Sequence, residues 1–393
     1  MRLFDQLERA FTGPAKYSES SFDFLNRSAR DSAKAVRTVL EECFHRFPAE
    51  SQADLRGRLR SSDGRQSTAA FYELYLHEVA RRLTFEIEPH PIVSGSNHHL
   101  DFKLTKRAEV YYLEVTAAAP SNEDFAAARR ISRVYDTLDR MNSPNFFVGV
   151  ELQGAPETDP PGARIREFLA RELARLNPDD VARDFDRGGL DVLPRWQFHH
   201  EGWDIVFSPI PKRPESRGKP GLRPLGFQMT APEYVQCRES IVAAIESKAN
   251  LYGELDHPYV IAVNVLHNFV DDDEIMDALF GQEATIVTPL PGGQFRTAHT
   301  RQPNGGWHGP TGPRATQVSA ALMIDNFSHW DIARRAPVLW HNPWARRPLS
   351  PAVWPFEQTI GDRATGRLDR LDAKRSPHRF FELPRTWPAR GLG

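Results

Sequence analysis

Two carboxylate side chains, Asp101 and Glu114, stand in short segments that otherwise alternate between apolar and polar residues. The segments read LDFKL (100–104) and VYYLEVT (110–116), and the polar residues KRA lie between them. Two such runs separated by a short polar connection predict a β-hairpin. Because side chains alternate between the faces of a strand, Asp101 and Glu114 are expected to converge on one face if the two strands pair.

The chemistry of such a pair is that of a cation site. Two carboxylates held close together repel each other and are costly to remove from water. A divalent cation removes that cost, and carboxylate oxygens are ligands that Mg²⁺ and Mn²⁺ accept. A bound Mg²⁺ or Mn²⁺ lowers the pKa of a bound water and neutralises charge that grows on a phosphate. The pair therefore predicts metal-assisted cleavage of a phosphodiester bond.

The elements around the pair have a definite order. An apolar stripe at helical spacing predicts a helix over 68–83, with Glu73 at the edge of the stripe, and a strand closed by prolines follows at 83–91. After the hairpin come a helix (124–140), an apolar strand (145–152) and another helix (162–176). This order predicts a mixed α/β sheet flanked by helices, with the first three strands adjacent and the strand at 145–152 added by a crossover.

The order and the residues together resemble the PD-(D/E)XK nuclease superfamily, the restriction-endonuclease-like fold, over roughly residues 65 to 155. The resemblance implies that Asp101 and Glu114 bind the metal and that Glu73 joins them. It also implies that a Lys two residues after the Glu helps to position or activate the attacking water. The expected substrate is nucleic acid, DNA rather than RNA.

The motif of this chain departs from the pattern, because Thr116 stands at the position of that Lys. A threonine carries no charge and can only hydrogen-bond a water or a phosphate oxygen. Lys103, two residues after Asp101 on the same predicted face, is the first candidate to supply the missing ammonium. Lys248, on a helix of the C-terminal half, is the second. The predicted catalytic set is therefore Asp101, Glu114, Lys103 and Thr116, and the predicted metal ligands are Glu73, Asp101 and Glu114.

The rest of the chain divides into further segments. The prediction is an N-terminal helical region (1–64), the nuclease-like core (65–176), a linker with a strand and a basic loop (177–230), a C-terminal α/β extension (231–350) and a loosely packed tail (351–393). Two domains and one elaborated sheet both fit this order. Five basic residues of the loop are candidates to contact DNA phosphates, namely Lys212, Arg213, Arg217, Lys219 and Arg223.

Composition narrows the classes of protein without selecting one. The chain has 393 residues, of which 50 are Lys or Arg and 52 are Asp or Glu, so no overall positive field favours nucleic acid. Two cysteines are too few for a disulfide framework and indicate a reducing cytosol. The N-terminus does not read as a signal peptide, and no apolar run reaches the ~18 residues of a membrane span. We therefore expect a cytoplasmic protein with no membrane partner, and a homodimer stays open.

Three other interpretations stay open at this stage. The first is a nuclease fold that has lost its chemistry and serves as a nucleic-acid-binding or scaffold protein. The second is that Asp101 and Glu114 are ordinary polar residues on the solvent face of an antiparallel sheet. The third is a carboxylate pair that acts on another substrate such as a glycoside, which requires a spacing that the sequence does not define.

Overall fold

The computed structural model describes residues 1–93, 98–154, 157–219, 221–230, 237–267, 270–291, 294–363 and 367–388. The chain divides into two compact units. Unit 1 consists of Met1–Pro14, Ser20–Pro120 and Val235–Gly393, whereas unit 2 consists of Ala15–Glu19 and Ser121–Tyr234. Most of unit 2 is therefore one long insertion in the sequence of unit 1.

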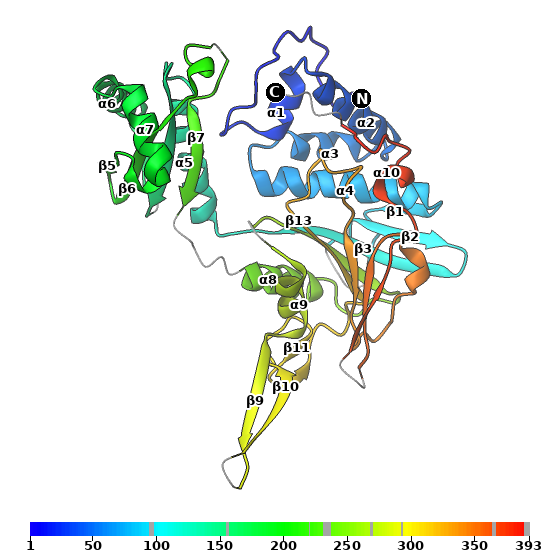
Figure 1. The fold of residues 1–393 in the computed structure, drawn as a ribbon. Coiled ribbons are helices and arrows are strands. Elements are labelled where there is room, and N and C mark those ends of the chain that lie inside the picture. The colour runs from blue at the N-terminus through cyan, green and yellow to red at the C-terminus, as the bar shows by residue number, and fades with distance from the viewer. Residues whose placement is uncertain are drawn as a thin grey trace. The chain divides into compact units, whose positions relative to one another are not determined.

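Unit 1 is built on an eight-stranded mixed sheet (Figure 1). Its strands are β1 (Glu86–Pro89), β2 (Phe102–Lys106), β3 (Glu109–Ala118), β8 (Tyr259–Val265), β13 (Ala320–Asp325), β14 (Val338–His341), β15 (Gln358–Gly361) and β16 (Leu368–Leu371). They lie side by side in the order β1-β2-β3-β8-β13-β14-β15-β16. The predicted fold class, a mixed α/β sheet flanked by helices, is confirmed.

The helices of unit 1 cover both faces of this sheet (Figure 1). They are α1 (Ser21–Arg27), α2 (Asp31–Arg46), α3 (Gln52–Leu59), α4 (Gly64–Arg82), α8 (Cys237–Ala249), α9 (Asp272–Phe280), the short α10 (Pro377–Phe380) and the 3₁₀ turn η3 (Pro351–Val353). Phe102 and Leu113 pack on the α4 side, whereas Tyr112 packs with residues of α8 and α9. Coverage on both faces explains why every residue of β8 is buried.

Helix α4 lies deep within unit 1. It begins after Asp63, whose side chain accepts a hydrogen bond from the backbone N–H of Arg65 at 3.0 Å. Every residue from Ala70 to Ala80 is buried, because the helix is in contact with β3 on one side and with α2 and α3 on others. The apolar stripe in the sequence indicated only one buried face, so the sequence underestimated how completely this helix is enclosed.

Two small sheets complete unit 1. Strands β9 (Glu283–Pro289) and β10 (Phe295–Arg301) pair as an antiparallel hairpin that projects from the body of the unit (Figure 1). The strands β11 (His308–Gly309) and β12 (Gly312–Pro313) form a much shorter pair. The projecting hairpin exposes apolar side chains, among them Val287 and Phe295.

Unit 2 has its own sheet and its own core. Its strands β4 (Phe146–Gln153), β5 (Trp196–His200), β6 (Trp203–Pro211) and β7 (Leu225–Thr230) lie in the order β5-β6-β4-β7. Its helices are α5 (Asn122–Leu138), α6 (Gly162–Ala174) and α7 (Pro178–Gly188), with the 3₁₀ turns η1 (Gly189–Val192) and η2 (Pro214–Ser216). Val148, Val150, Ile165 and Phe207 belong to one buried cluster, so this unit buries apolar surface of its own.

Two predicted assignments differ from the structure. The strand predicted at 145–152 is β4, which pairs with β6 and β7 in unit 2, whereas the strand beside β3 is β8. The predicted core at 65–176 and linker at 177–230 are therefore divided differently, because β4 to β7 pair only with one another. Residues 231–236, where the predicted C-terminal extension begins, lie outside the described part of the chain, and helix α8 is described from Cys237.

The predicted loosely packed tail is also wrong. Strands β15 and β16 extend the large sheet, and Phe356, Phe380, Phe381 and Trp387 are buried in the same cluster as α4. The low density of apolar residues in 351–393 misled the prediction, since a few large aromatic rings bury enough surface to hold a segment in place.

Two predictions from composition can be compared with the structure. Cys43 and Cys237 are free and buried. Among the helices that the structure describes, none combines the length and the apolar character needed to cross a membrane.

Candidate functional site

The predicted hairpin forms and brings the two carboxylates together. Strands β2 and β3 are antiparallel, with Phe102 opposite Leu113 and Lys103 opposite Tyr112. The same register places Asp101, directly before β2, across from Glu114. Oδ2 of Asp101 accepts a hydrogen bond from the backbone N–H of Val115 at 2.7 Å. This bond holds the Asp101 carboxyl against β3.

Glu114 is almost fully buried and contacts a lysine from another part of the chain. The residue is only 3% exposed, and its Oε1 accepts a hydrogen bond from Nζ of Lys248 at 2.5 Å. Its second oxygen, Oε2, is buried and has no hydrogen-bond partner among the described residues. One oxygen of Glu114 therefore binds the ammonium while the other remains available to a ligand.

Helix α8 explains the position of Lys248. Its buried residues Cys237, Ile241, Ile245 and Ala249 recur every four positions, which defines the face that packs against the sheet. Lys248 follows Ile245 by three positions and therefore projects close to this face. The spacing is visible in the sequence, but what the helix packs on is not.

The ranking of the two lysines is corrected by these contacts. Nζ of Lys103 lies 3.9 Å from Oε2 of Glu88 on the neighbouring strand β1, so this ammonium faces the outer edge of the sheet. Lys248, the second candidate, is the lysine that contacts Glu114. Thr116 is half-buried and shares the face of Glu114 by alternation, with Val263 of β8 opposite it.

Glu73 reaches the site from α4 and is held by a partner that the sequence did not suggest. Its Oε2 accepts a hydrogen bond from Nη1 of Arg58 at 2.6 Å, and the residue is 1% exposed. Its Oε1 is buried without a hydrogen-bond partner in the described parts of the chain. Arg58 belongs to α3. An arginine fifteen positions before Glu73 carries no sequence signal for this role, so only the packing of α3 against α4 identifies it.

The carboxyl groups of Asp101, Glu114 and Glu73 interact electrostatically. Burial raises the pKa of Asp101 well above its usual range, and the charges of Glu114 and then Glu73 raise it further. The pKa of Tyr252 is also raised, first by burial and then by the charge of Glu114, and its hydroxyl donates to the backbone oxygen of His99 at 3.1 Å. Burial and two neighbouring carboxylates therefore oppose the ionisation of Asp101, and Tyr252 is a neighbour that the sequence analysis missed.

The donor set fits a divalent cation held by few protein ligands. In the described ranges of the chain, no group of three or more His, Cys, Asp or Glu side chains is arranged to hold a metal ion. A bound cation would nevertheless stabilise the ionised form of Asp101, whose pKa is raised, and would give the buried Oε2 of Glu114 a partner. Mg²⁺ is commonly held by one or two carboxylates and takes its other ligands from water and substrate phosphates. Asp101 and Glu114 fit that arrangement, and Glu73 lies close enough to add charge.

The basic residues proposed to contact DNA belong to unit 2 and mostly serve its fold. Lys212 is 3% exposed and donates to the backbone oxygen of Ser143, so its predicted phosphate contact is wrong. Burial lowers the pKa of Lys212. Arg217 pairs with Asp179 at 2.7 Å.

Arg223 is engaged in the same way, while two of the five basic residues remain at the surface. Arg223 pairs with Asp139 at 2.7 Å, and its guanidinium lies 4.5 Å from the ring centre of Tyr17. Arg213 and Lys219 are exposed. These two are therefore the members of the predicted set that a phosphate can reach.

Comparisons with models of protein families, with curated proteins and with solved structures found no match. The function of this chain is therefore inferred from its own side chains, their distances and their charges.

Proposed function

We propose that this chain is a divalent-metal-dependent nuclease that hydrolyses phosphodiester bonds of nucleic acid, with DNA as the expected substrate. The observation that supports the proposal best is the meeting of Asp101, Glu114 and Lys248. Two carboxylates face each other across β2 and β3, and an ammonium lies 2.5 Å from one of them. Phosphodiester hydrolysis needs carboxylates that hold a metal ion and a nearby positive group that contacts the phosphate or the attacking water.

Each residue has a distinct role in this proposal. Asp101 and Glu114 would hold Mg²⁺ or Mn²⁺, which supplies a bound water of lowered pKa and positive charge for the phosphate. The ammonium of Lys248 donates hydrogen bonds and can orient the attacking water or a phosphate oxygen. Glu73 strengthens the negative potential and is itself fixed by Arg58. Thr116 contributes only a hydroxyl.

The order of elements supports the proposal as well. Helix α4 precedes β1, β2 and β3, and helix α8 precedes β8, which lies parallel to β3. With unit 2 set aside, unit 1 has one helix, three strands, one helix and one strand in this order, whereas the sequence analysis took the second helix and the fourth strand from residues 124–152, which belong to unit 2. The second helix and the fourth strand come from after unit 2, and α8 also carries the lysine.

A second function is favoured by the same ion pairs. Lys248 already compensates Glu114, and Arg58 already compensates Glu73. With Thr116 at the motif position, this arrangement also suits a nuclease-like protein that has lost catalysis and retains a binding or scaffold role. The two functions differ in whether a divalent cation displaces or joins the lysine at Glu114.

The test is cleavage of plasmid and single-stranded DNA by the purified chain with Mg²⁺ or Mn²⁺, alongside calorimetric titration of Mn²⁺. Asp101→Asn and Glu114→Gln preserve shape and remove charge, and Lys103→Met serves as the control because its ammonium lies beside Glu88. The nuclease proposal expects cutting and Mn²⁺ binding to disappear in the first two variants and to persist in the control. Mn²⁺ binding without cutting favours the scaffold function. If the chain shows no Mn²⁺ binding and no cutting, the nuclease proposal is refuted.

A further inference from the structure

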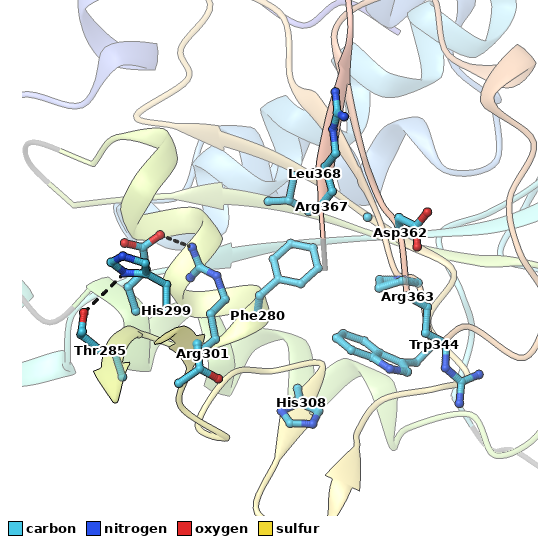
Figure 2. Close-up of a pocket in the computed structure, with 15 residues that line it drawn as sticks. Phe280, Thr285, His299, Arg301, His308, Trp344, Asp362, Arg363, Arg367 and Leu368 are labelled. Carbon is cyan, nitrogen blue, oxygen red and sulfur yellow. Dashed lines mark hydrogen bonds and ion pairs between the residues drawn. The ribbon is translucent and has the colours of Figure 1, made fainter. Parts of the chain in front are cut away.

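A cleft of about 590 Å³ lies in unit 1 among residues that the carboxylate site does not use. It lies between the base of the β9–β10 hairpin, the end of α9 and the adjoining ends of β15 and β16 (Figure 2). Its volume is within the range of small-molecule sites, about 300–1,000 Å³. Asp101, directly before β2, and Glu114, in β3, lie at the other half of the sheet, so this cleft is a separate site.

Aromatic rings form one part of the lining. The rings of Trp344 and His308 stack with centroids 5.5 Å apart and an interplanar angle of 26°. Phe280 at the end of α9 lies 6.3 Å from Trp344 by ring centroids, and its own ring is fixed against the buried Trp307 at 5.2 Å. Trp344 is half-buried. Its indole is therefore supported by other rings while part of it faces the cleft, which is what a stacking platform requires.

Cationic side chains form the other part. Figure 2 shows Arg363 beside Trp344 and Arg301 on the side of the hairpin. Arg301 is shared by Asp277 at 2.8 Å and Glu283 at 3.0 Å, so its guanidinium is already occupied by two carboxylates. Arg363 is exposed and lines the cleft beside the exposed Asp362, whereas Arg367 pairs with Asp369 at 2.9 Å. Among the described residues of the lining, the guanidinium of Arg363 is therefore the cationic group that lies beside Trp344 (Figure 2).

We propose that this cleft binds a nucleotide, with the base stacked on Trp344 and the phosphate against Arg363. The pairing of a flat aromatic surface with a guanidinium suits a ligand that carries both an aromatic ring and a phosphate. Two sources offer that chemistry, a free nucleoside monophosphate and a base with its phosphate in a single strand of nucleic acid. The inference goes beyond the proposed nuclease function, since it concerns binding by residues far along the sheet from Asp101.

The test is calorimetric titration of the full chain with adenosine monophosphate, adenosine, inorganic phosphate and a short single-stranded oligonucleotide. Trp344→Leu keeps apolar bulk and removes the stacking ring, so affinity for adenosine monophosphate should fall about tenfold or more. Arg363→Gln should weaken adenosine monophosphate and phosphate while leaving adenosine unchanged. The matched control is Arg346→Gln, because Arg346 is exposed and does not line the cleft.

The outcomes distinguish a free nucleotide from a nucleic-acid strand, and they distinguish nucleotide binding in the cleft from the proposed nuclease activity. Binding of the monophosphate identifies a free nucleotide, and binding of the oligonucleotide alone identifies a strand. Absence of binding by all four probes, or affinities unchanged in both cleft variants, overturns the inference. Arg363 is exposed, so its variant tests the inference even if Trp344→Leu fails to fold. Nucleotide binding that persists in Asp101→Asn separates this inference from the nuclease proposal.

Discussion

The contact between Lys248 and Glu114 offers the sharpest prediction. The Glu114 side chain is 4% exposed and that of Lys248 is 25% exposed, so the ion pair is largely removed from water. Lys248→Met keeps most of the aliphatic stem and leaves Glu114 charged and buried. Removing one partner of a buried pair costs about 3–5 kcal/mol. We expect the lower value, about 3 kcal/mol, because Lys248 retains some contact with solvent.

The assay is thermal unfolding followed by tryptophan emission. Trp196 and Trp203 lie in unit 2, and the other tryptophans lie in unit 1, so the signal reports mainly the unit that holds the pair. A loss of about 3 kcal/mol corresponds to a fall in Tm of roughly 6–12 °C for a unit of this size.

A double variant separates the ion pair from a loss of packing. Lys248→Met combined with Glu114→Gln removes both charges, so most of the lost Tm should return. Addition of Mn²⁺ should stabilise the single variant more than the parent chain, because the cation replaces the missing ammonium at Glu114. A single variant within about 1 kcal/mol of the parent chain, or a double variant as unstable as the single one, would refute the reasoning.

Three further outcomes follow from other contacts. Since the pKa of Asp101 is raised in the folded chain, stability should fall as pH rises from about 4 through the raised pKa. Asp101→Asn should flatten this pH profile and raise Tm at neutral pH. Arg58→Met should lower stability by about 3 kcal/mol and Glu73→Gln should rescue it, as urea unfolding would report, because Glu73 is 1% exposed. Phe381→Ala should cost about 3–5 kcal/mol in the same assay, because this ring is buried against Tyr75 at 5.3 Å, whereas a loosely packed tail would leave stability unchanged.

The local part of the site was determined by the sequence alone. Alternation in two short runs specified that Asp101 and Glu114 share a face, and the short polar connection between them set the register that brings them together. The helix with Glu73 was equally evident from its apolar spacing. These features depend on residues close in sequence, so backbone periodicity and turn length are enough to predict them.

The rest of the site was decided by tertiary structure. Lys248 lies 134 positions after Glu114. The strand β8 lies beside β3, whereas the sequence analysis added the strand at 145–152, which is β4, to this sheet by a crossover. A strand such as β4 carries the same apolar pattern whether it pairs with β3 or with β6, since periodicity reports burial and not the identity of the neighbour. The pairing partner of β4 is set by the separate core of unit 2, in which β4 to β7 pair with one another. The carboxylate site in unit 1 is therefore completed by α8 and β8.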